Sequence, residues 1–247
     1  MSFDGTAQLP VGSSKARHSL YESFELVPAL NADLNSVGDA TSAAELTKTL
    51  VANKSFELLG TNASTGDATL DVDGGIKCET DGAANDENII LPHLDSGQSA
   101  WHSTKWDTEK QVGWGCVIQT GSSVADTTIW AGLKLTNTDV IGTDEDQAFF
   151  RYHPSENGGK WQLITRDNNA ANVIRTVGPA VAASTTYYLS LKINSALDVS
   201  YTVNDVTGIA SDAVDTEIDL IPYIGISAET GSAKHFYVRK TWISKAY

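Results

Sequence analysis

The sequence has little cysteine and no long apolar run. Only two cysteines, Cys78 and Cys116, occur in 247 residues, which is too few for the disulfide framework of a small secreted domain. No stretch approaches the roughly 18 apolar residues of a membrane-spanning helix, and residues 1–28 lack the basic and apolar regions of a signal peptide. The sequence therefore predicts synthesis in a cytoplasm and two buried free thiols.

Basic residues are also scarce. Asp and Glu outnumber Lys and Arg by 31 to 17, and the formal net charge is −14. A surface with that charge repels the phosphates of nucleic acids and of anionic lipids. The composition therefore argues against nucleic acid and against a membrane as direct partners.

Motifs for metal or cofactor chemistry are missing as well. The five histidines are scattered, and neither His-x-x-x-His nor Cys-x-x-Cys occurs, so a zinc site would have to be assembled from residues distant in sequence. Gly-x-Ser-x-Gly is also absent, so no serine has the local motif of a nucleophile. The run at 71–75 begins like a calcium loop but lacks its later acids. We expect this run and the acidic runs at 85–88 and 143–147 to be solvated turns, and we predict no cofactor.

Alternation of apolar and polar residues is what the sequence does contain, from about residue 54 onward. In "YYLSLKIN" (187–194), every second position is apolar: Tyr187, Leu189, Leu191 and Ile193. The segments at 112–119, 129–136 and 199–204 alternate in the same way. A period of two indicates strands with one buried face, paired antiparallel. Roughly a dozen such segments, separated by turn residues, predict an all-β, two-sheet antiparallel sandwich.

Residues 1–53 differ from the rest because no period persists in them. We predict an irregular N-terminal arm over 1–53 and a sandwich domain over 54–247. Ser42 and Glu45 match a capping box, so one short helix is expected over 43–52.

Four apolar side chains stand out in this otherwise polar arm: Tyr21, Phe24, Leu26 and Leu30. An arm of this kind folds either against its own domain or against a neighbouring subunit. We take the four residues as candidate contacts to a partner.

The stretch "DTEIDLIPYIG" (215–225) raises the possibility of glycoside hydrolysis. Laminarinase- and lichenase-type β-glucanases carry Glu-x-Asp-x-x-Glu or Glu-x-Asp-x-Glu on a strand, and Glu217 and Asp219 resemble its first two acids. The third acid is replaced by Ile221 or Pro222, so no residue of the motif can protonate the leaving oxygen. An outward strand face is the expectation, with Ile218, Leu220, Ile224 and Ile226 on the opposite face.

Six tryptophans could stack on sugar rings if they are exposed. Trp114 shares its face with the predicted core, whereas Trp130 lies on the face opposite the aliphatic residues of its strand. Packing is the commoner fate of a tryptophan. Trp130 and Trp161 are the candidate glycan contacts if the protein binds carbohydrate.

The last three quarters of the chain, about 55–247, resemble a known family. The resemblance rests on the segments "DQAFFRYHPSENGGKWQLITRDNN", "VIRTVGPAVAASTTYYLSLKIN", "VSYTVNDV" and "DLIPYIGISAETGSAKHFYVRKTWIS", and on "GGIKCETDGAANDENIILPHL" and "IWAGLKLTNTDV" before them. Together they look like the concanavalin A-like lectin/glucanase sandwiches found in structural proteins of tailed phages, most like capsid decoration (cement) proteins. The resemblance implies a jelly-roll sandwich and carries over no catalytic residue.

The resemblance leads to a functional hypothesis. We expect a non-enzymatic virion protein that binds the major capsid protein and decorates the outer capsid surface, assembling in the host cytoplasm. The acidic charge suits a capsid exterior, and a homotrimer is expected by analogy only. The alternatives are a carbohydrate-binding module of a tail fibre or adhesin and, least supported, a β-glucanase.

Overall fold

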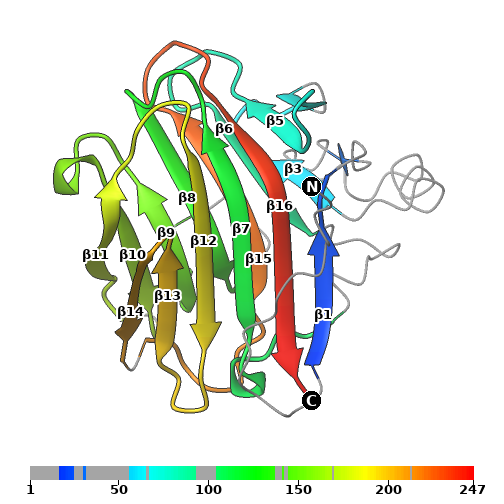
Figure 1. The fold of residues 1–247 in the computed structure, drawn as a ribbon, viewed down its shortest axis with the longest axis vertical. Coiled ribbons are helices and arrows are strands. Elements are labelled where there is room, and N and C mark those ends of the chain that lie inside the picture. Colours follow the sequence, from blue (N-terminus) through cyan, green and yellow to red (C-terminus); the bar gives the residue numbers. More distant parts are fainter. Residues whose placement is uncertain are drawn as a thin grey trace, which may run out of the picture.

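The chain folds into two stacked antiparallel sheets. The computed structural model describes residues 17–24, 30–31, 56–64, 67–92, 104–136, 141, 144–168, 170–211 and 213–247. In these residues sixteen strands form two sheets of eight, which lie face to face in Figure 1. The predicted all-β sandwich is confirmed. None of the helices in these ranges is long and apolar enough to cross a membrane.

Sheet A faces the viewer in Figure 1 and has β16 near its centre. Its order is β14 (Val206–Ala210), β13 (Val199–Val203), β12 (Thr186–Ile193), β7 (Gly113–Thr120), β16 (His235–Ala246), β5 (Ile76–Glu79) and β4 (Ala68–Leu70). The first half of β16 pairs with β5, and its second half pairs with β1 (Arg17–Glu22). A β-bulge separates the two halves, between Val238 and Lys240.

Sheet B lies behind sheet A. Its order is β11 (Val173–Ala180), β10 (Lys160–Arg166), β9 (Gln147–Tyr152), β8 (Thr127–Lys134), β15 (Ile221–Ala228), β6 (Glu87–Pro92), β3 (Phe56–Leu59) and β2 (Leu30–Asn31). All its pairs are antiparallel except β2 with β3. Two short 3-10 turns, η4 (Thr108–Lys110) and η5 (Asn157–Gly159), lie in the loops before β7 and before β10.

The core lies between the sheets and follows the alternation of the sequence. The apolar faces predicted for β12 and β7 are buried in it, and these predictions are confirmed. Cys78 and Cys116 are both buried and form no disulfide. Burial raises the pKa of both thiols above the ordinary value, which makes them inert structural residues.

The N-terminal segment contributes to both sheets. Arg17–Glu22 is β1 at the edge of sheet A, and Leu30–Asn31 is β2 at the edge of sheet B. Between them Phe24 is fully buried in the core, with its ring centroid 5.4 Å from that of Phe56. The boundary after residue 53 stays a prediction, but two stretches before it are strands of the sandwich.

The four arm residues therefore have different positions. Phe24 is buried by its own domain, where its ring packs against Phe56 of β3, so its assignment as a partner contact is wrong. Tyr21 is 51% exposed on β1. Leu30 lies in β2, where the structure describes no side chain, while Leu26 and the expected helix at 43–52 lie outside the described residues.

Phe24→Ala should test whether this segment belongs to the fold. Removing a fully buried phenylalanine costs about 3–5 kcal/mol, and we expect a loss of that size in the free energy of unfolding, measured by urea denaturation. Tyr21→Ala, three residues away on an exposed position, serves as the control and should change it by less than about 1 kcal/mol. Equal effects of the two substitutions would contradict the placement of Phe24.

Candidate functional site

The two acids that resemble a glucanase motif do not lie on a strand. Glu217 sits in a turn with a φ of 58°, and β15 begins only at Ile221. Asp219 forms an isolated bridge with Asp107, and its carboxylate accepts a hydrogen bond of 2.5 Å from the backbone N–H of Trp106. Asp219 thus holds the segment around Trp106 in place. Both acids are exposed, as expected, but the prediction that they lie on a strand is wrong. Their apolar neighbours do pack against the core, as predicted: Ile218, Leu220, Ile224 and Ile226.

Trp161 is fully buried, so it cannot contact a glycan. On β10 it shares the inward face with Leu163, and its ring lies between Tyr152 and Tyr187, at centroid distances of 6.2 and 5.5 Å. The sequence prediction for this residue is wrong because both faces of β10 are buried from Trp161 to Thr165, polar residues included.

Trp130 lies on the outer face of sheet B and is half-buried, as its position opposite the aliphatic residues predicts. Its neighbours across the sheet are Arg151 on β9 and Gly225 on β15. Arg151 donates to the side-chain oxygen of Gln162 at 3.1 Å and pairs with Glu156. The ring thus has a hydrogen-bonding side chain on one flank and a glycine on the other.

Further polar groups continue along the same face. Thr128 precedes Trp130 by two residues on β8, and its hydroxyl donates to Glu229 at 2.8 Å. The Nε2 atom of His153 lies 3.3 Å from the same carboxylate. An aromatic face beside fixed hydrogen-bonding groups is the composition of a sugar-binding surface.

The centre of this outer face is buried. A second buried cluster covers it: Leu59, Ile89, Leu91, Phe149, Ile164 and Tyr223. Lys134 is fully buried beside it, 3.7 Å from a carboxylate oxygen of Asp144 and 5.7 Å from the centroid of the Tyr223 ring. Burial, with a smaller contribution from Asp144, raises the pKa of Tyr223 well above its ordinary value. A polymer cannot reach these groups in this structure.

Lys134→Ala tests the role of the buried pair. Removing one member of a buried ion pair leaves the other charge uncompensated and costs about 3–5 kcal/mol. We expect the lower end of that range, because Thr136 still donates two hydrogen bonds to Asp144. Urea denaturation measures the loss, and the double variant Lys134→Met/Asp144→Asn should recover most of it. A double variant no more stable than Lys134→Ala would contradict the pairing.

A row of aromatic rings crosses the outer face of sheet A. Tyr21 of β1 is the cross-strand neighbour of Trp242 of β16, and the Trp242 ring packs against that of Tyr188 of β12, with centroids 5.3 Å apart. The Trp242 ring reaches Tyr188 across β7 at Gly115, where a Cβ atom would lie 2.3 Å from the indole. Tyr21 and Tyr188 are 51% and 41% exposed. We call these three residues the aromatic row.

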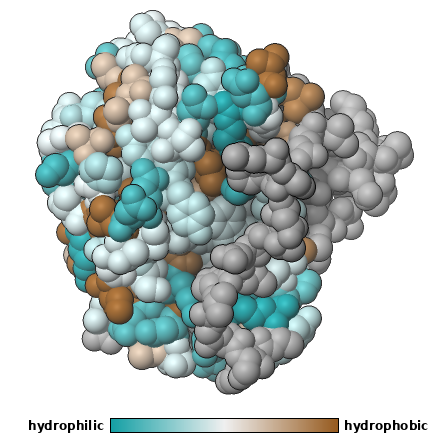
Figure 2. All heavy atoms as spheres, viewed as in Figure 1, coloured by the Kyte–Doolittle hydropathy of each residue, from teal (hydrophilic) through white to brown (hydrophobic). Residues whose placement is uncertain are grey.

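Arg239 extends this surface from the β16 bulge. Its guanidinium stacks on Tyr237, 4.8 Å from the ring centroid, donates to Gln119 at 2.5 Å and pairs with Asp71. The hydrogen bond from Arg239 is the main cause that lowers the pKa of Asp71. Figure 2 views the molecule from this side, and the region over β7, β12 and β16 is pale, the colour of residues of intermediate hydropathy.

The acidic runs are less solvated than expected. Asp86 from the run at 85–88 is buried and accepts hydrogen bonds from Asn62 and the Ala83 backbone. Asp144 and Asp146 from the run at 143–147 are buried as well. The prediction of solvated turns is wrong for these three residues, because each carboxylate accepts hydrogen bonds from its own loop or a neighbouring one.

One of these carboxylates belongs to a cluster. Ligand atoms of Asp146, Asp167 and Asp215 lie within 4.8 Å of one another, a spacing compatible with a hard divalent cation. Asp146 also accepts a hydrogen bond from the backbone N–H of Asn168, so one of its carboxylate oxygens already has a hydrogen-bond donor in the loop.

Sequence reasoning found Tyr21 but missed its two partners in the aromatic row. Alternation places Tyr188 on the polar face of its strand, which indicates that its ring is exposed. For Trp242 alternation predicts the wrong face. It lies an even number of residues after the buried Phe236 and Val238, so it should point inward with them. The bulge after Val238 reverses the parity and turns Trp242 outward.

Comparison with known proteins identifies the fold. No family model and no curated protein matches the sequence. The β-glucanase of Bacillus licheniformis superposes with a TM-score of 0.56 and 10% identity over 93% of this chain and 98% of its own. A Shewanella oneidensis MR-1 protein of unknown function gives 0.56 and 13% over 96% and 90%. A family 7 alginate lyase, A1-II′, gives 0.54 and 14% over 74% and 83%.

The fold is a concanavalin A-like jelly roll. The implication of the sequence resemblance for architecture is thereby confirmed. At such low identities the likeness extends to the fold alone. The neighbours include enzymes, and the expectation that this chain is not one stays a prediction.

Proposed function

We propose that the protein is a non-enzymatic structural protein of a tailed-phage virion, which binds the major capsid protein and decorates the outer capsid surface. The observation that carries the proposal is the aromatic row on sheet A, with Arg239 stacked on Tyr237 further along β16. Tyrosine, tryptophan and arginine are the residues enriched at the centres of protein interfaces. The sequence resemblance supplies the identity of the partner.

Two further features support a structural role. The central groups on the outer face of sheet B, Lys134 and Tyr223, are buried and out of reach of a polymer substrate. The net charge of −14 suits the exterior of a DNA-filled shell. Binding across neighbouring capsomers would stabilise the assembled shell by mass action, and a homotrimer remains part of the proposal by analogy.

The capsid contact is tested with point variants, because deleting residues 1–50 would remove β1 and the buried Phe24 together. Tyr21→Ala and Trp242→Ala should each weaken binding to undecorated capsids of the encoding phage at least about tenfold, since central interface aromatics cost about 2 kcal/mol or more when truncated. Co-sedimentation measures the affinity.

The control is Ile209→Ala, an exposed apolar residue on β14 at the far end of the same sheet. It should bind as the wild type does. Wild-type affinity of both aromatic variants, or a capsid map in which sheet A faces solvent, would overturn the proposed contact.

Glycan binding is the second candidate, and the surroundings of Trp130 favour it. Its half-exposed ring lies among Thr128, Arg151, Gln162 and Glu229 on the outer face of sheet B. Two of the superposed proteins, a glucanase and an alginate lyase, are named for polysaccharides. In this alternative the chain is a carbohydrate-binding module of a tail fibre or adhesin.

A glycan array separates the two candidates. If the alternative is correct, the wild type gives saturable signals that fall at least about tenfold in Trp130→Ala, because stacking and its desolvation are lost. Trp242→Ala, which removes an aromatic ring from the other sheet, should keep the signal. An array without signal, or equal loss in both variants, would remove Trp130 from consideration as a glycan contact.

A further inference from the structure

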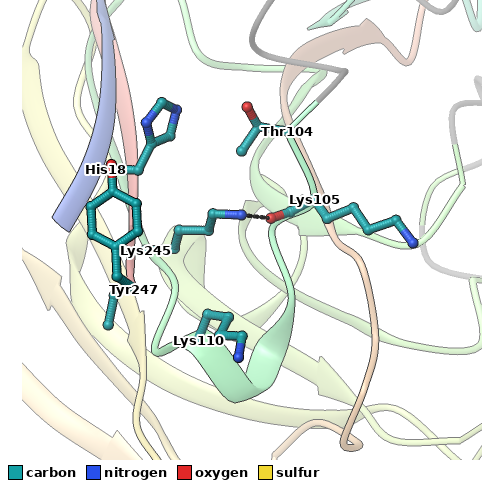
Figure 3. A pocket seen from close by; sticks show the side chains of 7 residues that line it. His18, Thr104, Lys105, Lys110, Lys245 and Tyr247 are labelled. Atoms are coloured by element: carbon teal, nitrogen blue, oxygen red, sulfur yellow. Dashed lines mark hydrogen bonds between the residues drawn. The ribbon is translucent and has the colours of Figure 1, made fainter.

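A cavity of about 570 Å³ opens under the paired ends of β1 and β16. Its walls come from three separate parts of the chain: His18 on β1, Thr104 to Lys110 before β7, and Lys245 to Tyr247 at the end of β16. Figure 3 shows the side chains of His18, Thr104, Lys245 and Lys110 around this space, while the Lys105 side chain leads away from it.

The cavity is cationic in an otherwise acidic protein. Three of the 17 basic residues line it, namely Lys105, Lys110 and Lys245. Lys245 donates a hydrogen bond of 2.7 Å to the carbonyl of Lys105, and that acceptor is neutral. Within the described ranges, none of the three ammonium groups forms an ion pair with a carboxylate.

The acids closest in sequence are engaged elsewhere. Asp107 accepts from the backbone N–H of Glu109, and Glu109 accepts from the hydroxyl of Thr216. Asp219 accepts from the backbone N–H of Trp106. All three donors are neutral, so the carboxylates keep their charge, but among the described residues none of them forms an ion pair with Lys105, Lys110 or Lys245.

The His18 side of the cavity is held in place by Trp106, which lies buried behind it. Trp106 is buried, with its ring stacked on His18 at a centroid distance of 5.8 Å and the Lys245 ammonium 5.9 Å from its centroid. The Nε2 atom of His18 is buried and has no hydrogen-bond partner among the described residues. A buried polar atom without a partner costs free energy unless a water or a ligand satisfies it.

We propose that this cavity is an oxyanion-binding site that takes a carboxylate or a sulfate group. Lys245 and Lys110 supply charged donors, the hydroxyl of Thr104 supplies a neutral one, and Nε2 of His18 donates as the Nε2–H tautomer or as imidazolium. The exposed ring of Tyr247 at the rim can cover a carrier such as a sugar ring. The site is independent of the capsid and glycan contacts proposed above, because it lies on neither of those faces.

The experiment titrates the full chain with sodium sulfate and, separately, with sodium glucuronate, at an ionic strength held constant with sodium chloride. Backbone amide shifts in ¹H–¹⁵N spectra report binding. We expect saturable shifts at Thr104 to Lys110 and at Lys245, with a dissociation constant of about 1 mM, the affinity of a few charge-assisted hydrogen bonds in a partly open site.

Lys110→Gln removes an exposed charge without disturbing the core, and it should weaken binding about tenfold. Lys245→Gln should act similarly while keeping a donor for the Lys105 carbonyl. The matched control is Lys160→Gln, an exposed lysine at the start of β10 in the other sheet, and it should bind as the wild type does.

The outcomes decide the proposal and its ligand. Binding of both anions supports a general oxyanion site, and binding of glucuronate alone supports a carboxylated sugar. Shifts that do not saturate, or an equal loss of affinity in Lys110→Gln and Lys160→Gln, would mean unspecific charge attraction and would overturn the site. Glucose, which has the ring without the charge, should cause no shift at these amides.

Discussion

The arrangement of sheet A depends on one extra residue in β16. This strand pairs with β7 along most of its length, with β5 in its first half and with β1 in its second. Phe236 and Val238 point inward before the bulge, and Thr241 and Ile243 are buried after it. Arg239, at the bulge itself, is held by Asp71 and Gln119. Because the bulge shifts which residues point inward, β16 pairs with β5 before it and with β1 after it while keeping an apolar inner face.

Local alternation was enough to predict the strands whose two faces differ in polarity. The inner faces of β7, β8 and β12 follow the sequence because apolar residues occupy every second position of each strand. Alternation fails to identify the inner face in the part of sheet B whose outer face holds a second buried cluster. There the successive residues Leu163 and Ile164 are both buried. Trp161 was misassigned for that reason, and Glu217 because nothing in a short acidic run indicates a left-handed turn.

The surfaces with functional potential could be predicted only in part, because they are made by pairings distant in sequence. Tyr21 was recognisable as an apolar residue in a polar segment, but its neighbours Trp242 and Tyr188 come from strands far along the chain. The cavity beneath the same edge needs His18 and Lys245 to be cross-strand neighbours. Both features depend on β1, which forms in a segment whose sequence shows no strand period.

The pairing of β1 with β16 also constrains the order of folding. Leu20 is the partner of Ile243, so all the strands between β1 and β16 must be synthesised before this edge of sheet A can form. Contacts between such distant segments are the slowest to close, since loop entropy opposes them until the intervening strands are in place. Before that step Phe24 has no complete pocket, and the β16 edge stays open to other chains. β1 is therefore synthesised before its partner strand β16 and pairs only after β16 has formed.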